Sequence, residues 1–275
     1  MNAQTAAARA RRIGHSTDGS DLLDHAVRVG LVAYGVVHLL IAWVAVQLAL
    51  GDDTGQASGD GALSRLASTP VGGPLLYIVA FGFFALVVWR LIEAAVGYRE
   101  HDGGKRAAKR TGSALKAAIY GSLGVSALKI AIGGGSSGGG TDTMTAKMMA
   151  LPAGPFLVGL VGLGILAYAG RLIYRGLSEG FKKHLEVEGQ VGHTGTAFVT
   201  FGKVGYVSKG AAMLVVGGLF GYAALTRNPE KSGGLDQALH EVLQQPFGAP
   251  TLITMGLGIG CYGLFCFAWA RHLDR

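Results

Sequence analysis

Charged residues are scarce in this chain of 275 residues. Asp, Glu, Lys and Arg make up only 15% of it, whereas a soluble domain carries about 25%. Half of the residues are hydrophobic, and the mean hydropathy is +0.39. Glycine, with 46 residues, exceeds twice its average share of about 7%. This combination excludes a disordered chain, argues against a single soluble domain, and favours a membrane protein whose small residues let helices pack closely.

Cysteine is also scarce, which excludes a fold stapled by several disulfides. Cys261 and Cys266 lie five residues apart in one apolar run. A helix would point them about 140° apart, so we expect two free thiols. The first 20 residues hold Arg9, Arg11 and Arg12 but lack the apolar core of a signal peptide. Residues 1–28 are therefore predicted to be a flexible basic cytoplasmic tail.

Six apolar runs are long enough to cross a bilayer, which takes about 20 residues and requires helical backbone. They are Val29–Leu50, Leu75–Gly97, Ser113–Gly133, Pro155–Tyr174, Val204–Thr226 and Pro250–Arg271. Of the 24 lysines and arginines, 19 flank the runs on one side and four on the other, and Lys129 lies inside a run. The positive-inside rule places the larger group, with Lys116 and Lys209, in the cytoplasm together with both termini.

The chain repeats itself three times. Gly30, Tyr34 and Gly35 align at equal offsets with Gly112, Lys116 and Ala117, and with Gly205, Lys209 and Gly210. Each even-numbered run opens with prolines and glycine, in the segments Pro70–Pro74, Pro152–Pro155 and Pro246–Pro250. An amphipathic stretch precedes each of these segments, at residues 62–66, 144–148 and 235–243, and is predicted to be a short helix at the outer interface.

The predicted fold is an all-α integral membrane protein. Six transmembrane helices form three two-helix hairpins in parallel orientation, at residues 29–97, 112–176 and 204–272. Units with an even number of spans do not invert, so we expect a pseudo-threefold axis along the membrane normal.

The repeated pattern resembles the bacterial domain-of-unknown-function 1206 family, in which a two-helix membrane unit occurs three times. The resemblance rests on the opening motif Gly-x-x-x-[Tyr/Lys]-[Gly/Ala] at Gly30, Gly112 and Gly205, on the proline-glycine segments, and on Arg90 and Arg171. It covers Val29 to Arg271. It implies a multipass protein of the bacterial plasma membrane, and it implies no particular reaction, substrate or catalytic residue.

Ionisable groups at bilayer depth are costly and are functional candidates. Gln47, Lys129 and Tyr222 occupy equivalent places near the outer ends of the odd-numbered runs. Threefold symmetry would gather them into one polar layer. Either this layer lines an outward vestibule that favours anions, or Lys129 extends to the outer interface.

His38 lies in the middle of the first run. It could serve as a proton relay, a haem or metal ligand, or a substrate contact, but no second ligand stands at helical spacing. An interhelical hydrogen bond is therefore the preferred prediction. Neither a metal nor another cofactor is expected.

Arg90 and Glu93 are three residues apart and can pair on one helix face. With Arg171 they form either an anchor at the cytoplasmic end or, joined by Lys116 and Lys209, a gate or a site for anionic lipid headgroups.

Two groups of glycines have different predicted roles. The run from Gly133 to Gly140 lacks the Lys-Ser/Thr end of a phosphate-binding loop and is predicted to be a flexible loop. Seven others are predicted to pack helices together: Gly30, Gly112, Gly205, Gly217, Gly221, Gly256 and Gly260.

No nucleophile motif and no intramembrane carboxylate pair is present, so we expect neither a catalytic residue nor an enzyme. Nucleic acid is excluded as a partner because the basic residues flank apolar runs. The preferred function is transport or pore-type passage of a small solute or ion along the repeat axis. The alternatives are a structural or accessory membrane protein and, least favoured, an enzyme using His38. Expected partners are the lipid bilayer, anionic headgroups on the cytoplasmic side, and a second copy or another membrane protein.

Overall fold

The computed structural model describes residues 3–52, 56–99, 103–134, 141–184 and 192–272, and within these ranges it holds helices and no strand. The long helices are α1 (Ala3–Ala49), α3 (Gly72–Val96), α4 (Gly103–Ala131), α6 (Gly154–Leu177), α7 (Gly192–Thr226) and α9 (Gly248–Arg271). The short ones are α2 (Gly59–Ala67), α5 (Thr141–Met149), α8 (Leu235–Leu243) and the 3₁₀ turns η1 (Gly180–His184) and η3 (Pro229–Lys231).

Six helices are long and apolar enough to cross a membrane, as predicted. These spans are His25–Ala49, Gly72–Val96, Gly103–Ala131, Gly154–Leu177, Thr194–Thr226 and Gly248–Arg271. Pro74, Pro155 and Pro250 lie in the first turns of α3, α6 and α9, where a missing N–H leaves no helical bond unmade. The three short helices before them, α2, α5 and α8, are confirmed as helices. Their position at the outer interface stays a prediction.

Large apolar side chains are exposed on every long helix. Examples are Trp43, Phe81, Leu115, Phe156, Leu214 and Leu257. Water would disfavour so much exposed apolar surface, whereas lipid chains solvate it. Together with the six spans, this surface indicates a multipass membrane protein.

Three helices begin at least ten residues earlier than the apolar runs predicted. The segment expected to be a flexible tail instead continues the helix of the first span, because α1 begins at Ala3 and runs unbroken to Ala49. Its alanine-rich, proline-free sequence favours helix even without apolar periodicity. Likewise α4 begins at Gly103 rather than at Ser113, and α7 at Gly192 rather than at Val204. Residues 1–2, and 135–140 of the predicted glycine loop, lie outside the described ranges.

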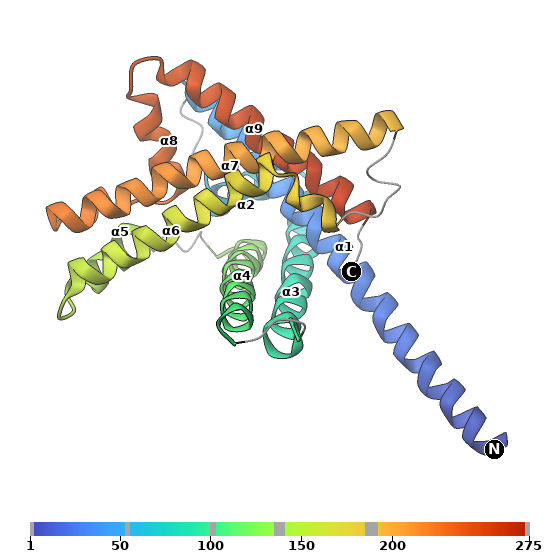
Figure 1. Cartoon of the computed structure of the whole chain (residues 1–275). Coiled ribbons are helices and arrows are strands. Elements are labelled where there is room, and N and C mark those ends of the chain that lie inside the picture. Colours follow the sequence, from blue (N-terminus) through green and yellow to red (C-terminus); the bar gives the residue numbers. More distant parts are fainter. Residues whose placement is uncertain (1–2, 53–55, 100–102, 135–140, 185–191, 273–275) are drawn as a thin grey trace.

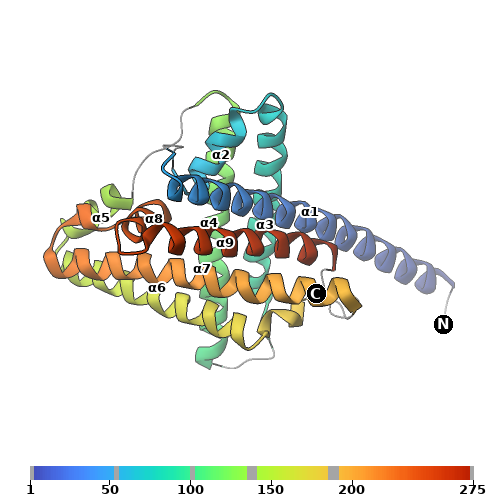
Figure 2. The ribbon, with the colours of Figure 1, turned by 90° about the horizontal axis from the view of Figure 1, so that it is seen from above.

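The long helices pack in the spatial order α4, α3, α1, α9, α7, α6. Figure 1 shows α1 beside α9 and α6 beside α7, with these two pairs crossing each other, and Figure 2 shows the α3–α4 pair crossing both of them. Within the first and third repeats the two spans pack on each other, α1 on α3 and α7 on α9. In the second repeat α4 packs on α3 and α6 on α7, and the described parts of α4 and α6 are barely in contact. The pseudo-threefold axis therefore stays a prediction.

Glycines allow several of these helices to touch backbone to backbone. A Cβ at Gly30 would collide with the carbonyl oxygen of Gly82, and a Cβ at Gly35 would lie 2.9 Å from that of Gly263. Of the predicted packing glycines, Gly205, Gly217, Gly256 and Gly260 also face a neighbouring helix, with the nearest foreign atoms at 2.5, 2.8, 3.2 and 3.4 Å from the added Cβ. Gly112 and Gly221 differ, because a Cβ at either would meet no atom within 4 Å. Their predicted packing role is not observed, although a Cβ added at Gly162 would lie 3.1 Å from the backbone nitrogen of Gly221.

Candidate functional site

Lys209, near the middle of α7, projects toward α1 and α9. Its Nζ donates a hydrogen bond to the hydroxyl of Tyr34 at 2.7 Å and lies 2.9 Å from Nε2 of His38. The same nitrogen is 4.1 Å from the ring centroid of Tyr262 and 4.8 Å from that of Tyr34. The tyrosine hydroxyl, the histidine nitrogen and the ring of Tyr262 therefore surround this amine, and all three attract a cation. We call Lys209 and His38 the Lys–His pair.

The backbone fixes which nitrogen of His38 carries hydrogen when the ring is neutral. Nδ1 lies 2.8 Å from the carbonyl oxygen of Tyr34, one turn earlier on α1. A carbonyl oxygen only accepts, so Nδ1 donates and Nε2 keeps its lone pair. Nε2 then accepts from Lys209, which makes this an interhelical hydrogen bond between the first and third repeats. The interhelical hydrogen bond predicted for His38 is therefore present, and the side chain of His38 is buried.

No described carboxylate compensates the charge of this pair. The titratable groups around it are Tyr34 on α1, Tyr206 on α7, and Tyr262 and Cys266 on α9, all neutral in their usual state. If both Lys209 and His38 were protonated, two like charges 2.9 Å apart would repel by about 6 kcal/mol at an effective dielectric constant of about 20. Simultaneous protonation of Lys209 and His38 is therefore unfavourable.

Tyrosine rings connect this pair to other helices. Tyr34 lies edge-on to Tyr120 of α4, with ring centroids 5.3 Å apart, and to Tyr262 of α9 at 6.1 Å. Tyr262 in turn lies 5.2 Å from Tyr206 of α7. These edge-to-face contacts fix the rings around Lys209, and they join side chains from all three repeats.

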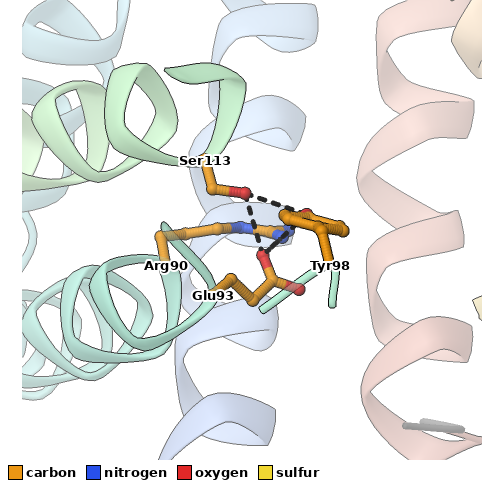
Figure 3. A network of polar contacts seen from close by, with 4 residues as sticks. All are labelled: Arg90, Glu93, Tyr98 and Ser113. Carbon is orange, nitrogen blue, oxygen red and sulfur yellow. Dashed lines mark hydrogen bonds and ion pairs between the residues drawn. The ribbon is translucent and has the colours of Figure 1, made fainter. Parts of the chain in front are cut away.

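A second polar network centres on Glu93 near the end of α3 (Figure 3). Its Oε2 accepts from Arg90 Nη1 at 2.6 Å, from Ser113 Oγ at 3.1 Å and from Tyr98 at 3.4 Å. The hydroxyls of Tyr98 and Ser113 are also 2.9 Å apart. The predicted pairing of Arg90 and Glu93 is therefore present. It also ties α3 to α4, because Ser113 belongs to α4.

The other candidates lie apart from these networks. Gln47 is partly buried, and its Oε1 is enclosed without a hydrogen-bond partner among the described residues. Lys129 is exposed, Tyr222 is 52% exposed, and Arg171 is exposed near the end of α6. Lys129 and Tyr222 therefore do not form a buried cluster with Gln47. The polar layer of Gln47, Lys129 and Tyr222 stays a prediction.

No group of three or more His, Cys, Asp or Glu residues in the described ranges is placed to hold a metal ion. Cys261 and Cys266 are both free thiols, as expected.

The alignment of the three repeats already related the residues around the Lys–His pair, although sequence reasoning did not connect them. Tyr34, Lys116 and Lys209 share one offset from the opening glycines, and His38 and Tyr120 share the next turn. The structure brings four of these five positions into contact, with Tyr34 at the centre. Lys209 was expected at the cytoplasmic end of its span. Because α7 begins at Gly192, Lys209 lies near the middle of the helix, and its depth in the membrane stays a prediction.

Comparison with known proteins agrees with the threefold pattern. The family model described as Domain of Unknown Function (DUF1206) matches residues 29–97, 111–179 and 204–272. The chain is also 29% identical, over 239 residues and 86% of each chain, to an uncharacterized protein of Bacillus subtilis (strain 168), YxxB. No solved structure matches. The chain therefore belongs to the DUF1206 family and carries its membrane unit three times.

Proposed function

We propose that this protein is a proton-conducting membrane protein of the bacterial plasma membrane, with both termini in the cytoplasm and no enzymatic activity. The observation that carries the proposal is the Lys–His pair, in which two ionisable side chains from different repeats share a hydrogen bond without a carboxylate. Ionisable groups at such depth are costly, and proton relays are among the functions that justify the cost.

The direct contact within the pair supports this proposal. His38 is buried, and Lys209 is partly buried. A proton taken up by Lys209 can reach His38 through the 2.9 Å contact without movement of the helices. His38 lies on the first repeat and Lys209 on the third, so this transfer crosses from one repeat to another.

The proposed orientation follows from the positive charges. Most lysines and arginines lie beside one set of span ends, and positively charged loops stay in the cytoplasm. Lys116 and Lys209 lie near the middles of α4 and α7 and leave this count, yet 17 against four remain.

Proton flux into liposomes tests the proposal. We expect vesicles containing the protein to acidify when a potassium diffusion potential, negative inside, is imposed and an entrapped pH dye is read. Lys209→Met should reduce the rate to that of protein-free vesicles, because the amine that takes up the proton is gone. His38→Gln retains an acceptor for Lys209 but cannot be protonated, so it should reduce the flux while preserving the fold.

Lys129→Met is the matched control, since it makes the same chemical change at an exposed lysine outside the Lys–His pair. It should conduct as the unaltered protein does. Equal rates for the unaltered protein, Lys209→Met and protein-free vesicles would overturn the proposal.

A structural or accessory role is the second candidate, and it would explain that negative result. Its specific support is the direct backbone contact of helices at Gly30 and Gly82 and at Gly35 and Gly263, which leaves no passage at those crossings.

A further inference from the structure

Four basic side chains from α3, α4 and α6 lie close enough to interact electrostatically. They are Arg90 of α3, Lys116 of α4, and Arg171 and Arg175 of α6. Lys116 is close enough to interact electrostatically with the other three and with Glu93. Four cations therefore face a single carboxylate, which is already paired with Arg90 at 2.6 Å. We call these four residues the basic cluster.

Two guanidinium groups of the basic cluster retain donors that no described residue satisfies. Nε of Arg90 and Nη2 of Arg175 are both buried, and neither has a hydrogen-bond partner within the described ranges. Arg90 as a whole is only 6% exposed, and Arg175 lies 5.1 Å from the ring centroid of Tyr206. A buried charged donor without an acceptor is unfavourable, so this arrangement favours an anion with several acceptor oxygens.

The basic cluster is reachable from outside the helix bundle. Arg171 is exposed and Lys116 partly so. Tyr168 of α6, which interacts electrostatically with Arg171 and Arg175, is 40% exposed. The described parts of α4 and α6 pack on α3 and α7 respectively and barely contact each other.

We propose that the basic cluster binds a phosphate group between α4 and α6 of the second repeat. Arginine presents paired donors that match the oxygens of phosphate, and Lys116 adds a mobile point charge. Arg90, Arg171 and Arg175 all lie toward the span ends predicted to face the cytoplasm, where phosphates of anionic lipids and free phosphate are both present. This site contains neither Lys209 nor His38, and it holds whether or not the protein conducts protons.

Thermal unfolding of the full chain in detergent, read from the fluorescence of its three tryptophans, tests the site. We expect phosphatidylglycerol, whose headgroup is anionic, to raise the unfolding midpoint more than phosphatidylcholine, whose headgroup is neutral overall. In the double variant Lys116→Gln/Arg171→Gln the phosphatidylglycerol concentration for half of this rise should increase about tenfold. Inorganic phosphate is the third additive. If it raises the unfolding midpoint and phosphatidylglycerol does not, the site binds free phosphate.

Lys105→Gln/Arg227→Gln is the matched control, because it removes one exposed lysine and one exposed arginine outside the basic cluster. It should respond to phosphatidylglycerol as the unaltered protein does. Both double variants should unfold at the unaltered midpoint without additive. The proposal is overturned if phosphatidylglycerol and phosphatidylcholine act equally and inorganic phosphate has no effect. It is equally overturned if the Lys116→Gln/Arg171→Gln variant responds like its control.

Discussion

At the scale of single residues, one carboxylate oxygen organises the end of the first repeat. Oε2 of Glu93 accepts from Arg90, Ser113 and Tyr98, and so connects α3, the segment after it and α4 (Figure 3). Arg90 is buried, and Glu93 is its only ion-pair partner in the described ranges. Removing one member of such a pair costs more than the pair itself contributes, because the remaining charge loses its compensation.

Glu93→Gln should therefore destabilise the protein by about 3 kcal/mol. Ser113→Ala removes one neutral donor to the same oxygen and should cost only about 1 kcal/mol. The unfolding midpoint in detergent measures both. Adding Arg90→Met to Glu93→Gln removes the unpaired charge and should recover part of the loss. A Glu93→Gln variant no less stable than Ser113→Ala would show that Arg90 does not depend on this carboxylate.

At the scale of helices, equivalent glycines differ in what they contact. A Cβ at Gly205 would lie 2.5 Å from the backbone Cα and nitrogen of Tyr262, so α7 and α9 cross there at the closest approach that glycine permits. Gly112 holds the same place in the second repeat and faces open space, because α4 packs away from α6. The same motif position is therefore a packing contact in one repeat and a lipid-side or solvent-side position in another.

Gly205→Ala should lower stability by about 1–3 kcal/mol, since the backbone of Tyr262 has to move. Gly112→Ala makes the same change without a clash, and it should leave stability unchanged or raise it slightly through helix propensity. Thermal unfolding of the two variants in one detergent provides the measurement. Equal midpoints would mean that the α7–α9 crossing is looser than the structure has it.

The positions of the helices could mostly be predicted from the sequence, whereas their side-chain contacts could not. Apolar runs located the six spans, and proline segments located the starts of α3, α6 and α9, because both signals are local. The start of α7 at Gly192 was missed, since the residues before Val204 are helical without being strongly apolar. The Lys–His pair was missed because the predicted span began at Val204, which put Lys209 near its end. It was also missed because Lys209 meets His38 only through tertiary packing.

At the scale of the whole molecule, the three repeats share a sequence pattern but pack differently. The strongest packing is between spans of different repeats, in the pairs α1–α9, α3–α4 and α6–α7, and these pairs cross one another (Figures 1 and 2). No local signal distinguishes this arrangement from three equal hairpins, since each repeat carries the same motifs. In the second repeat α4 and α6 barely contact each other, and Arg171 stays exposed and Lys116 partly so.

The crossing of α3 and α4 makes the membrane topology worth testing directly. Spanning helices tilt from the bilayer normal by roughly 0–40°, so helix pairs that cross one another do not by themselves define one transmembrane direction. Length and composition nevertheless identify α3 and α4 as spans, and the positive-inside rule predicts that the segment between them faces the cytoplasm. If all three repeats cross in parallel, positions before each even-numbered span lie outside, and positions after it lie inside.

We expect Ser68→Cys and Ala150→Cys to react with a membrane-impermeant maleimide in intact cells, whereas Ala108→Cys and Ser178→Cys react only after permeabilisation. All four positions are exposed, and Cys261 and Cys266 are first replaced by alanine. The second repeat provides the internal control, because Ala150 and Ser178 bracket α6, the equivalent even-numbered span. If Ser68 and Ala108 react alike while Ala150 and Ser178 differ, α3 does not span the bilayer, and the parallel threefold topology fails in the first repeat. Opposite reactivity at both pairs means that α3 and α6 both cross the bilayer, and in the same direction.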